Sequence, residues 1–139
     1  MRVDGICIEA VISSLPEALA YVRTALAASR VPEHAAMEVE LAVDEAVTNI
    51  IMHGFAGGGG RIRVLCTFDE EEITIRIEDR APPFDPTGAE APDTDADIDE
   101  RPIGGLGIHF IRQMTDEMQY RRQNGRNILI LKKHVQEGR

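Results

Sequence analysis

Apolar and polar positions alternate along three segments of the chain, and this alternation predicts β-strands. "ICIEAVI" (6–12) is rich in β-branched residues and places three isoleucines, Ile12 among them, on one face. "RIRVLCTF" (61–68) and "EITIRIED" (72–79) alternate more strictly. The acidic "DEEE" between these two segments predicts a hairpin turn.

Two further segments carry apolar residues at helical spacing. In "SSLPEALAYVRTALAAS" (13–29), Ser14 and Glu17 have the spacing of a capping box, which predicts a helix start. The apolar stripe of that helix consists of Leu15, Leu19, Val22 and Leu26. Pro32 suits the first turn of a second helix, which we expect to run to about residue 53 and to stop at Gly54.

The C-terminal part of the chain predicts a lid, a helix and a hairpin. Residues 80–104 show no periodicity, and so long a loop indicates a lid over a site. "GGLGIHFIRQMTDEM" (104–118) predicts a glycine turn that opens a third helix, and Asn124-Gly125 predicts a closing hairpin.

This order of elements predicts an α+β fold, a two-layer sandwich. We expect a mixed, mostly antiparallel sheet with three helices on one face. The other face would then be open and free for a partner. With 139 residues, the chain is expected to form a single domain, 1–139, with the lid at about 80–104.

Composition narrows the function classes. The chain has 24 acidic and 15 basic residues, a net charge of -9, which argues against broad contact with nucleic acid or an anionic membrane. Cys7 and Cys66 lie in apolar stretches without zinc or redox spacing, so we expect two buried free thiols. The N-terminus lacks the apolar run of a signal peptide, and no segment reaches the ~20 apolar residues of a membrane span. A cytoplasmic protein is therefore expected.

Polar residues interrupt the apolar pattern of the second helix. In "ELAVDEAVTNIIMHG" (40–54), Glu45 and Asn49 lie within about 40° of each other at the border of the apolar stripe. A carboxylate there needs a partner or a solvated cleft. The pattern fits a functional pair and also an ordinary, partly exposed helix face.

Asp79 extends an inward-facing series of isoleucines at the end of its strand; the series is Ile73, Ile75 and Ile77. Apolar walls around one fixed acceptor suit the recognition of an exocyclic amine on a flat heterocycle. An aspartate turned outward to cap the following loop fits the pattern equally well. Pro82 and Pro83 stiffen the exit from the strand.

The glycines of "GGLG" (104–107) permit positive φ angles and a close approach of the backbone to a ligand. A helix that starts there offers free N–H groups to a phosphate. Alone, this is also the pattern of a plain turn. The helix pair, the strand-end aspartate and the glycine segment occur in one order within one domain, and together they are not explained by packing alone.

The combination resembles the GHKL superfamily of Bergerat-fold ATP-binding domains, and more narrowly the anti-sigma-factor serine/threonine kinases of bacterial partner switches. The resemblance spans nearly the whole chain. It rests on "DEAVTNIIMHG", "EDRAPPFDP" and "GGLGIHFIRQMTDEMQYRRQNGRNILILKK". One departure is Ala81, because the family's first glycine box has glycine two residues after its aspartate.

The resemblance implies a role for each matching position. Asn49 would coordinate Mg²⁺ at the phosphates of ATP, Glu45 would be the general base, and Asp79 would accept from the adenine amino group. Gly105 and Gly107 would shape the lid over the phosphates. The other positions implied in nucleotide binding are Ala81, Phe84, Gly104 and Leu106.

The implied function is an ATP- and Mg²⁺-dependent protein serine/threonine kinase that acts as an anti-sigma factor. Its implied partners are a sigma factor and an anti-anti-sigma antagonist, which it phosphorylates, and homodimers are usual in the family. Two alternatives are a non-catalytic nucleotide-dependent module that sequesters a partner, and a detached histidine-kinase catalytic domain. Glu45 favours a kinase over a binding module, because a binding module has no use for a base.

Overall fold

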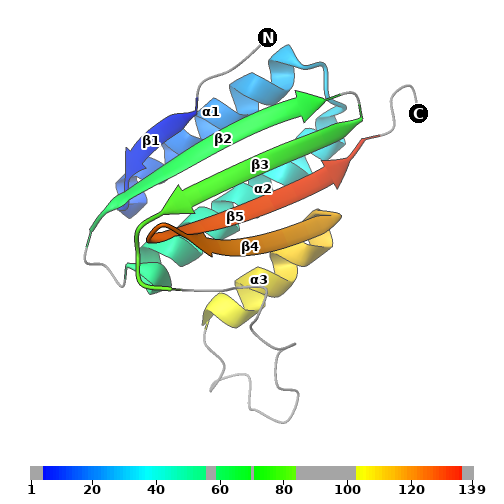
Figure 1. The fold of residues 1–139 in the computed structure, drawn as a ribbon. Helices are drawn as coiled ribbons and strands as arrows, with labels where there is room; N and C mark the ends of the chain where they lie inside the picture. The colour runs from blue at the N-terminus through cyan, green and yellow to red at the C-terminus, as the bar shows by residue number, and fades with distance from the viewer. Residues whose placement is uncertain (1–4, 56–58, 70, 84–102, 136–139) are drawn as a thin grey trace.

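The computed structural model of the protein describes residues 5–55, 59–69, 71–83 and 103–135, with only the backbone described at 103–108 (Figure 1). Phe84 and most of the expected lid (80–104) lie outside these residues. The elements are β1 (Ile6–Glu9), η1 (Ile12–Ser14), α1 (Leu15–Ala28), α2 (Glu33–Asn49), η2 (Ile50–Gly54), β2 (Arg61–Asp69), β3 (Glu72–Asp79), α3 (Ile103–Met114), β4 (Glu117–Gln123) and β5 (Arg126–His134). Among the helices described, none combines the length and apolar character needed to cross a membrane.

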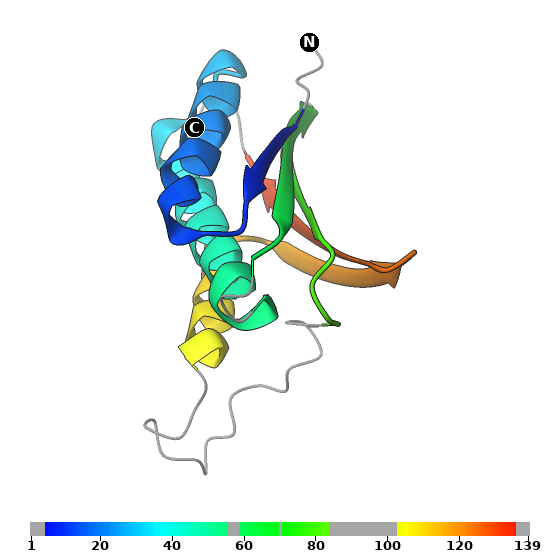
Figure 2. The same ribbon diagram turned by 90° about the vertical axis from the view of Figure 1, so that its left-hand side faces the viewer.

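The five strands form one sheet in the order β1-β2-β3-β5-β4, and all three long helices cover the same face of it (Figure 2). The predicted α+β sandwich is therefore confirmed. All four strand pairings are antiparallel, so the prediction of a mixed sheet is wrong. The reason is that β4 lies at the edge and its tight hairpin returns β5 between β4 and β3, which makes β5 antiparallel to both neighbours.

The core fills the space between the helices and the inner face of the sheet. The fully buried side chains of the sheet include Ile62, Val64, Ile73, Ile75, Ile77 and Leu131. Burial of one such side chain contributes about 1.5–3 kcal/mol. Ala35, Ala42 and Ala46 of α2 are also buried, and these small residues let the central helix pack closely on the sheet. The period-two pattern of β2 and β3 thus assigned the correct face to each residue.

The start of α1 differs from the prediction. β1 ends at Glu9, and Ile12 belongs to the 3-10 turn η1 with 49% of its surface exposed. Ser14 is the N-cap of α1 but makes no side-chain capping hydrogen bond, so the predicted capping box is absent. The turn is the cause: it holds Ser14 in a helical conformation (φ -87°, ψ -11°), whereas a capping serine needs an extended backbone.

The two thiols lie in different environments. Cys66 is buried as predicted, but Cys7 is exposed, which contradicts the expectation of two buried thiols. Cys7 pairs with Arg63 across β1 and β2, on the face of the sheet that carries no helix. An apolar sequence neighbourhood did not decide its burial, because alternate residues of an edge strand face opposite sides.

Candidate functional site

The expected site residues that the structure describes gather at one end of the sandwich. α2 ends there after Glu45 and Asn49, β3 ends there at Asp79, and α3 begins there at Ile103 (Figures 1 and 2). The antiparallel order of the sheet produces this arrangement, because β5 starts beside the end of β3. Segments far apart in the sequence therefore contribute to one region.

Asp79 is the buried acid of this region. It is only 5% exposed, on the same face as the buried isoleucines of β3, so the inward orientation is confirmed. Its Oδ1 accepts hydrogen bonds from the Ala81 backbone N–H (2.9 Å) and from Asn127 Nδ2 (2.9 Å). The bond to Ala81 shows that the carboxylate also caps the turn after the strand. Both hydrogen bonds end on Oδ1, so Oδ2 is the oxygen that we expect to serve a ligand.

Burial raises the pKa of Asp79 above its ordinary value. The hydrogen bonds from Asn127 and from the Ala81 backbone lower this pKa, and the positive charge of Arg122 lowers it further, but burial prevails. The surroundings therefore hold the carboxylate in place and only partly compensate its lost hydration.

Asn127 is the site residue that the sequence reasoning missed. It is 4% exposed and lies opposite Asp79 in the register of β3 and β5. Besides the bond to Asp79, its Nδ2 donates to the backbone carbonyls of Ala81 (3.1 Å) and Pro82 (3.2 Å). One amide group thus ties the acid to the chain that leaves β3.

The oxygen of this amide is also engaged. Asn127 Oδ1 accepts from the Tyr120 hydroxyl and from Arg122 Nη1 (3.0 Å), and Arg122 Nη1 also donates to the Ala81 carbonyl (2.9 Å). A signal for Asn127 was present in the sequence. It is an amide on the apolar face of a strand, at the start of a series continued by Leu129 and Leu131, just as Asp79 ends such a series.

Asn49 and Glu45 lie one turn apart on α2, as predicted. Asn49 is 6% exposed, and its Nδ2 has no hydrogen-bond partner among the residues that the structure describes. An unpaired buried amide costs about 1–3 kcal/mol, so a ligand that forms a hydrogen bond or coordination bond with it would compensate this cost. Glu45 is half-buried and forms no hydrogen bond or ion pair within the described part of the chain. The hydrogen bond between Asp44 and Thr48 (3.3 Å) belongs to the neighbouring side of the helix.

Asn49 is the last residue of α2 before the π-helical turn η2. π-helical turns are rare and often occur at functional sites. The turn ends at Gly54, and a Cβ atom at Gly54 would lie 3.5 Å from the Cβ of Ala81. Ala81 is 1% exposed, so its methyl group is accommodated against the end of η2. This packing gives a physical account of alanine at the position where the family has glycine.

α3 begins at Ile103, one residue before the glycines. Gly104, Gly105, Leu106 and Gly107 thus lie in its first turns, so the expectation of a glycine turn in front of the helix is wrong. The first four backbone N–H groups of a helix have no partner within that helix. Those of α3 are at the same end of the sandwich as the end of β3 (Figure 2), and β3 ends at Asp79.

The fold and the buried acceptor define the class of this protein. Residues 8–133 match the family of histidine kinase-like ATPase domains, and the chain belongs to that family. The resemblance to GHKL ATP-binding domains is thereby confirmed.

Among curated proteins, the chain is similar to the serine/threonine-protein kinase BtrW of Bordetella bronchiseptica. The two are 32% identical over 95 residues, which cover 68% of this chain and 67% of BtrW. It is also 25% identical over 99 residues to the serine-protein kinase RsbW of Bacillus cereus, over 68% of this chain and 62% of RsbW. The chain thus spans less than two thirds of the length of RsbW.

Two crystal structures share the fold. One contains the RsbU and RsbW domains of Rv1364c from Mycobacterium tuberculosis, with a TM-score of 0.63 and 16% identity, over 99% of this chain and 34% of that one. The other is the SiaB-SiaC complex from Pseudomonas aeruginosa, with a TM-score of 0.57 and 18% identity, over 94% of this chain and 89% of that one. At these identities the likeness concerns the fold alone.

Proposed function

We propose that this protein is an ATP- and Mg²⁺-dependent protein serine/threonine kinase that acts as an anti-sigma factor in a partner switch. Its substrate would be a serine or threonine of an anti-anti-sigma antagonist. The observation that carries this proposal is the half-buried carboxylate of Glu45, one helical turn from Asn49, in a chain that belongs to an ATPase family. Among the residues that the structure describes, neither the Glu45 carboxylate nor Asn49 Nδ2 has a partner. The similarity to BtrW, named a serine/threonine-protein kinase, supports the reaction type.

Asp79 would select adenine. Its Oδ2 would accept a hydrogen bond from the exocyclic amine, while Asn127 and the Ala81 N–H hold the carboxylate through Oδ1. A guanine presents a carbonyl oxygen at the same place, and two acceptors repel each other. The site would therefore favour ATP over GTP.

Asn49 fits a Mg²⁺ ligand. Rotation of its amide by 180° exchanges nitrogen and oxygen, so the end that lacks a partner can present the oxygen that Mg²⁺ prefers. When bound, Mg²⁺ supplies positive charge to the phosphates of the nucleotide. The start of α3 would add backbone N–H groups for phosphate oxygens, with Gly104, Gly105, Leu106 and Gly107 beside them. Ala81 would form part of the wall near the base, and Phe84 stays a predicted nucleotide contact.

Glu45 would act as general base. Its carboxylate would take the proton of the incoming hydroxyl while that oxygen bonds to the γ-phosphorus. The bond from the γ-phosphorus to the β–γ bridging oxygen breaks at the same stage, and ADP leaves. Proton acceptance and positioning are the main demands of this reaction, which agrees with so small a set of side chains.

Two observations support the proposed partners. The relatives include RsbW, named a serine-protein kinase, and the fold is shared with SiaB, which was crystallised with SiaC. A sigma factor and an antagonist protein would then compete for this chain, and a homodimer would be its assembly. We propose a cytoplasmic location and no direct contact with nucleic acid or membrane, consistent with the net charge of -9.

Nucleotide selection is tested with Asp79→Asn. This variant keeps an acceptor oxygen for Ala81 and Asn127 and replaces Oδ2 by an N–H donor. We expect it to bind ATP about 10–100-fold more weakly and to gain affinity for GTP. Calorimetric titration with each nucleotide measures both changes. An unchanged preference for ATP would remove Asp79 from the site.

Phosphoryl transfer is tested with radiolabelled ATP, Mg²⁺ and a candidate antagonist. We expect label on the antagonist in an acid-stable form, which excludes phosphohistidine. Glu45→Gln should bind ATP as the wild type does but lose transfer, by about 100-fold or more. Asp44→Asn, on the adjacent helix face, is the matched control and should retain transfer. ATP binding without transfer by the wild type would instead favour the non-catalytic binding module.

A further inference from the structure

A cluster of three potential metal ligands lies at the opposite end of the sandwich. Glu72 of β3, Glu117 of β4 and His134 of β5 place one ligand atom each within 4.8 Å of one another. β5 lies between the other two strands in the sheet. Glu72 is directly opposite His134, and Glu117 is opposite Lys132, two residues before His134. The cluster therefore spans three hydrogen-bonded strands.

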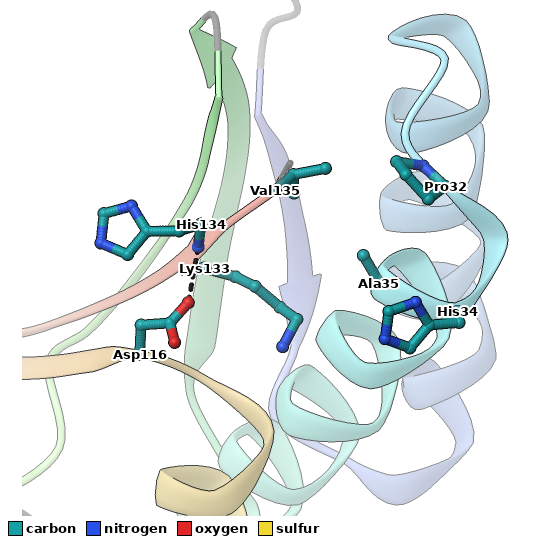
Figure 3. A pocket seen from close by; sticks show the side chains of 7 residues that line it. All are labelled: Pro32, His34, Ala35, Asp116, Lys133, His134 and Val135. Carbon is teal, nitrogen blue, oxygen red and sulfur yellow. Dashed lines mark hydrogen bonds between the residues drawn. The ribbon is translucent and has the colours of Figure 1, made fainter. Parts of the chain in front are cut away.

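The side chains project from the face of the sheet that carries no helix. Their neighbours Ile73 and Met118 face the core, and strand side chains alternate between the two faces. Figure 3 shows the same alternation in β5, where Lys133 points toward α2 and the His134 ring points away from it. The ring of His134 is thus directed away from His34, although both residues line a cavity of about 290 Å³ at this end of the sandwich.

The donor set and its spacing suit zinc. One imidazole nitrogen and two carboxylates are common ligands of Zn²⁺, with bonds of about 2.0–2.2 Å. Two ligands of a tetrahedral ion with such bonds lie roughly 3.4 Å apart. His134 Nδ1 and Glu72 Oε2 are already 3.5 Å apart. Glu117 is exposed, so its side chain is free to complete the set by a change of rotamer.

The backbone that carries His134 is held firmly. Its N–H donates to Asp116 Oδ2 (2.6 Å), and the next residue, Val135, donates to the Glu71 carbonyl (2.6 Å). These bonds link the end of β5 to the chain before β4 and to the chain before β3. The backbone of His134 therefore starts from a defined geometry, which lowers the entropy lost when an ion binds.

The ligand types of the cluster favour one class of cation over another. Lys132 lies directly opposite Glu117 in the register of β4 and β5. Hard cations such as Mg²⁺ and Ca²⁺ depend on several oxygen ligands, whereas Zn²⁺ gains from the imidazole nitrogen. The site should therefore prefer zinc to the magnesium expected at the nucleotide.

We propose that Glu72, Glu117 and His134 form a zinc-binding site, with water completing the coordination. Zinc there would join β3, β4 and β5 at their ends. The seven residue steps of β3 place about 23 Å between Glu72 and Asp79, so this site is separate from the nucleotide site. Its occupancy is independent of whether the protein is a kinase.

Titration of the nucleotide-free protein with ZnCl₂, followed by calorimetry, tests the proposal. We expect one saturable site and a higher melting temperature with zinc. His134→Gln should weaken binding at least about tenfold and abolish the thermal shift. His34→Gln is the matched control: His34 pairs with Glu38 (3.3 Å) at the same end of the sandwich but on the helix side.

A second variant separates a lost ligand from a damaged fold. Glu117→Gln alters an exposed side chain and should weaken zinc binding while the circular dichroism spectrum stays that of the wild type. In NMR spectra, zinc should shift the His134 ring and the ends of β3, β4 and β5. Absence of saturable binding, or equal affinity in His134→Gln and the wild type, would overturn the proposal. Equal weakening in His34→Gln would do the same.

Discussion

Replacement of Asn127 by alanine should destabilise the fold strongly, because its buried amide joins the ends of β3 and β5. The change removes the donor to Asp79 Oδ1 and the donors to the Ala81 and Pro82 carbonyls. Asp79 keeps the Ala81 N–H, and the Ala81 carbonyl keeps Arg122. One lost bond to a buried carboxylate, at about 1.5–3 kcal/mol, and one neutral bond, at about 1 kcal/mol, together give roughly 3 kcal/mol.

Urea unfolding measures this loss. With a slope of about 2 kcal/mol per molar urea, the midpoint should fall by roughly 1.5 M. Gln119→Ala, an exposed position on the same hairpin, is the control and should stay within about 0.5 kcal/mol of the wild type.

The pH dependence gives a second test. The folded pKa of Asp79 is raised, so the folded state holds this proton more tightly than the unfolded state, and the stability contributed by Asp79 falls as pH rises through the folded pKa. Asn127 lowers that pKa, so its removal raises the pKa further. The Asn127→Ala variant should therefore lose more stability relative to the wild type at about pH 7 than at about pH 4. Equal unfolding free energies of variant and wild type at neutral pH would refute the reasoning.

Three further outcomes are expected. Tyr21→Phe should lower the free energy of unfolding in urea by about 1 kcal/mol, because the Tyr21 hydroxyl accepts a hydrogen bond from the Cys66 N–H (2.9 Å). Cys66 lies past the end of the β1–β2 pairing, so β1 does not satisfy this N–H; no loss would contradict the prediction. Ser14→Ala should change the free energy of unfolding by less than about 0.5 kcal/mol, since no capping hydrogen bond is lost. A drop near 1 kcal/mol would instead indicate that Ser14 does cap the helix. A thiol reagent at about pH 8 should label exposed Cys7 in the native protein, whereas burial raises the pKa of Cys66 to about 12 and delays its labelling until unfolding. Equal labelling rates would contradict this assignment.

The sequence predicted those elements whose signals are local. β2 and β3 were placed almost to the residue because their alternation is strict. The hairpin at Asn124-Gly125 was predicted by a dipeptide that tolerates positive φ, and both residues have it (53° and 75°). The end of β1 was not predictable in this way. It pairs with β2 over only four residues, and tertiary packing, rather than the propensity of Ile12, ends the strand.

The candidate site was predictable where a polar residue broke an apolar pattern. Asp79 was found by that signal, and Asn127 carries the same signal on its own strand. Their pairing depends on a register between residues 48 positions apart, which local patterns do not contain. The glycines at 104–107 were located correctly along the chain, but the helix boundary was placed after them, because glycine is a poor helix former and a frequent turn residue.

On the face of the sheet that carries no helix, charged side chains cover part of the strands. Ile128 lies on this face opposite Glu78 and Arg121, yet it is only 1% exposed. Glu78 binds Arg76 Nε (2.6 Å) and Arg126 Nη1 (2.9 Å), so the long arginine stems lie over the strands beside it. Over these strands the sheet therefore presents charged groups to water, and little apolar surface is left there for self-association. A protein that docked here would first have to part these ions, and its attachment would loosen as the ionic strength of the medium increased.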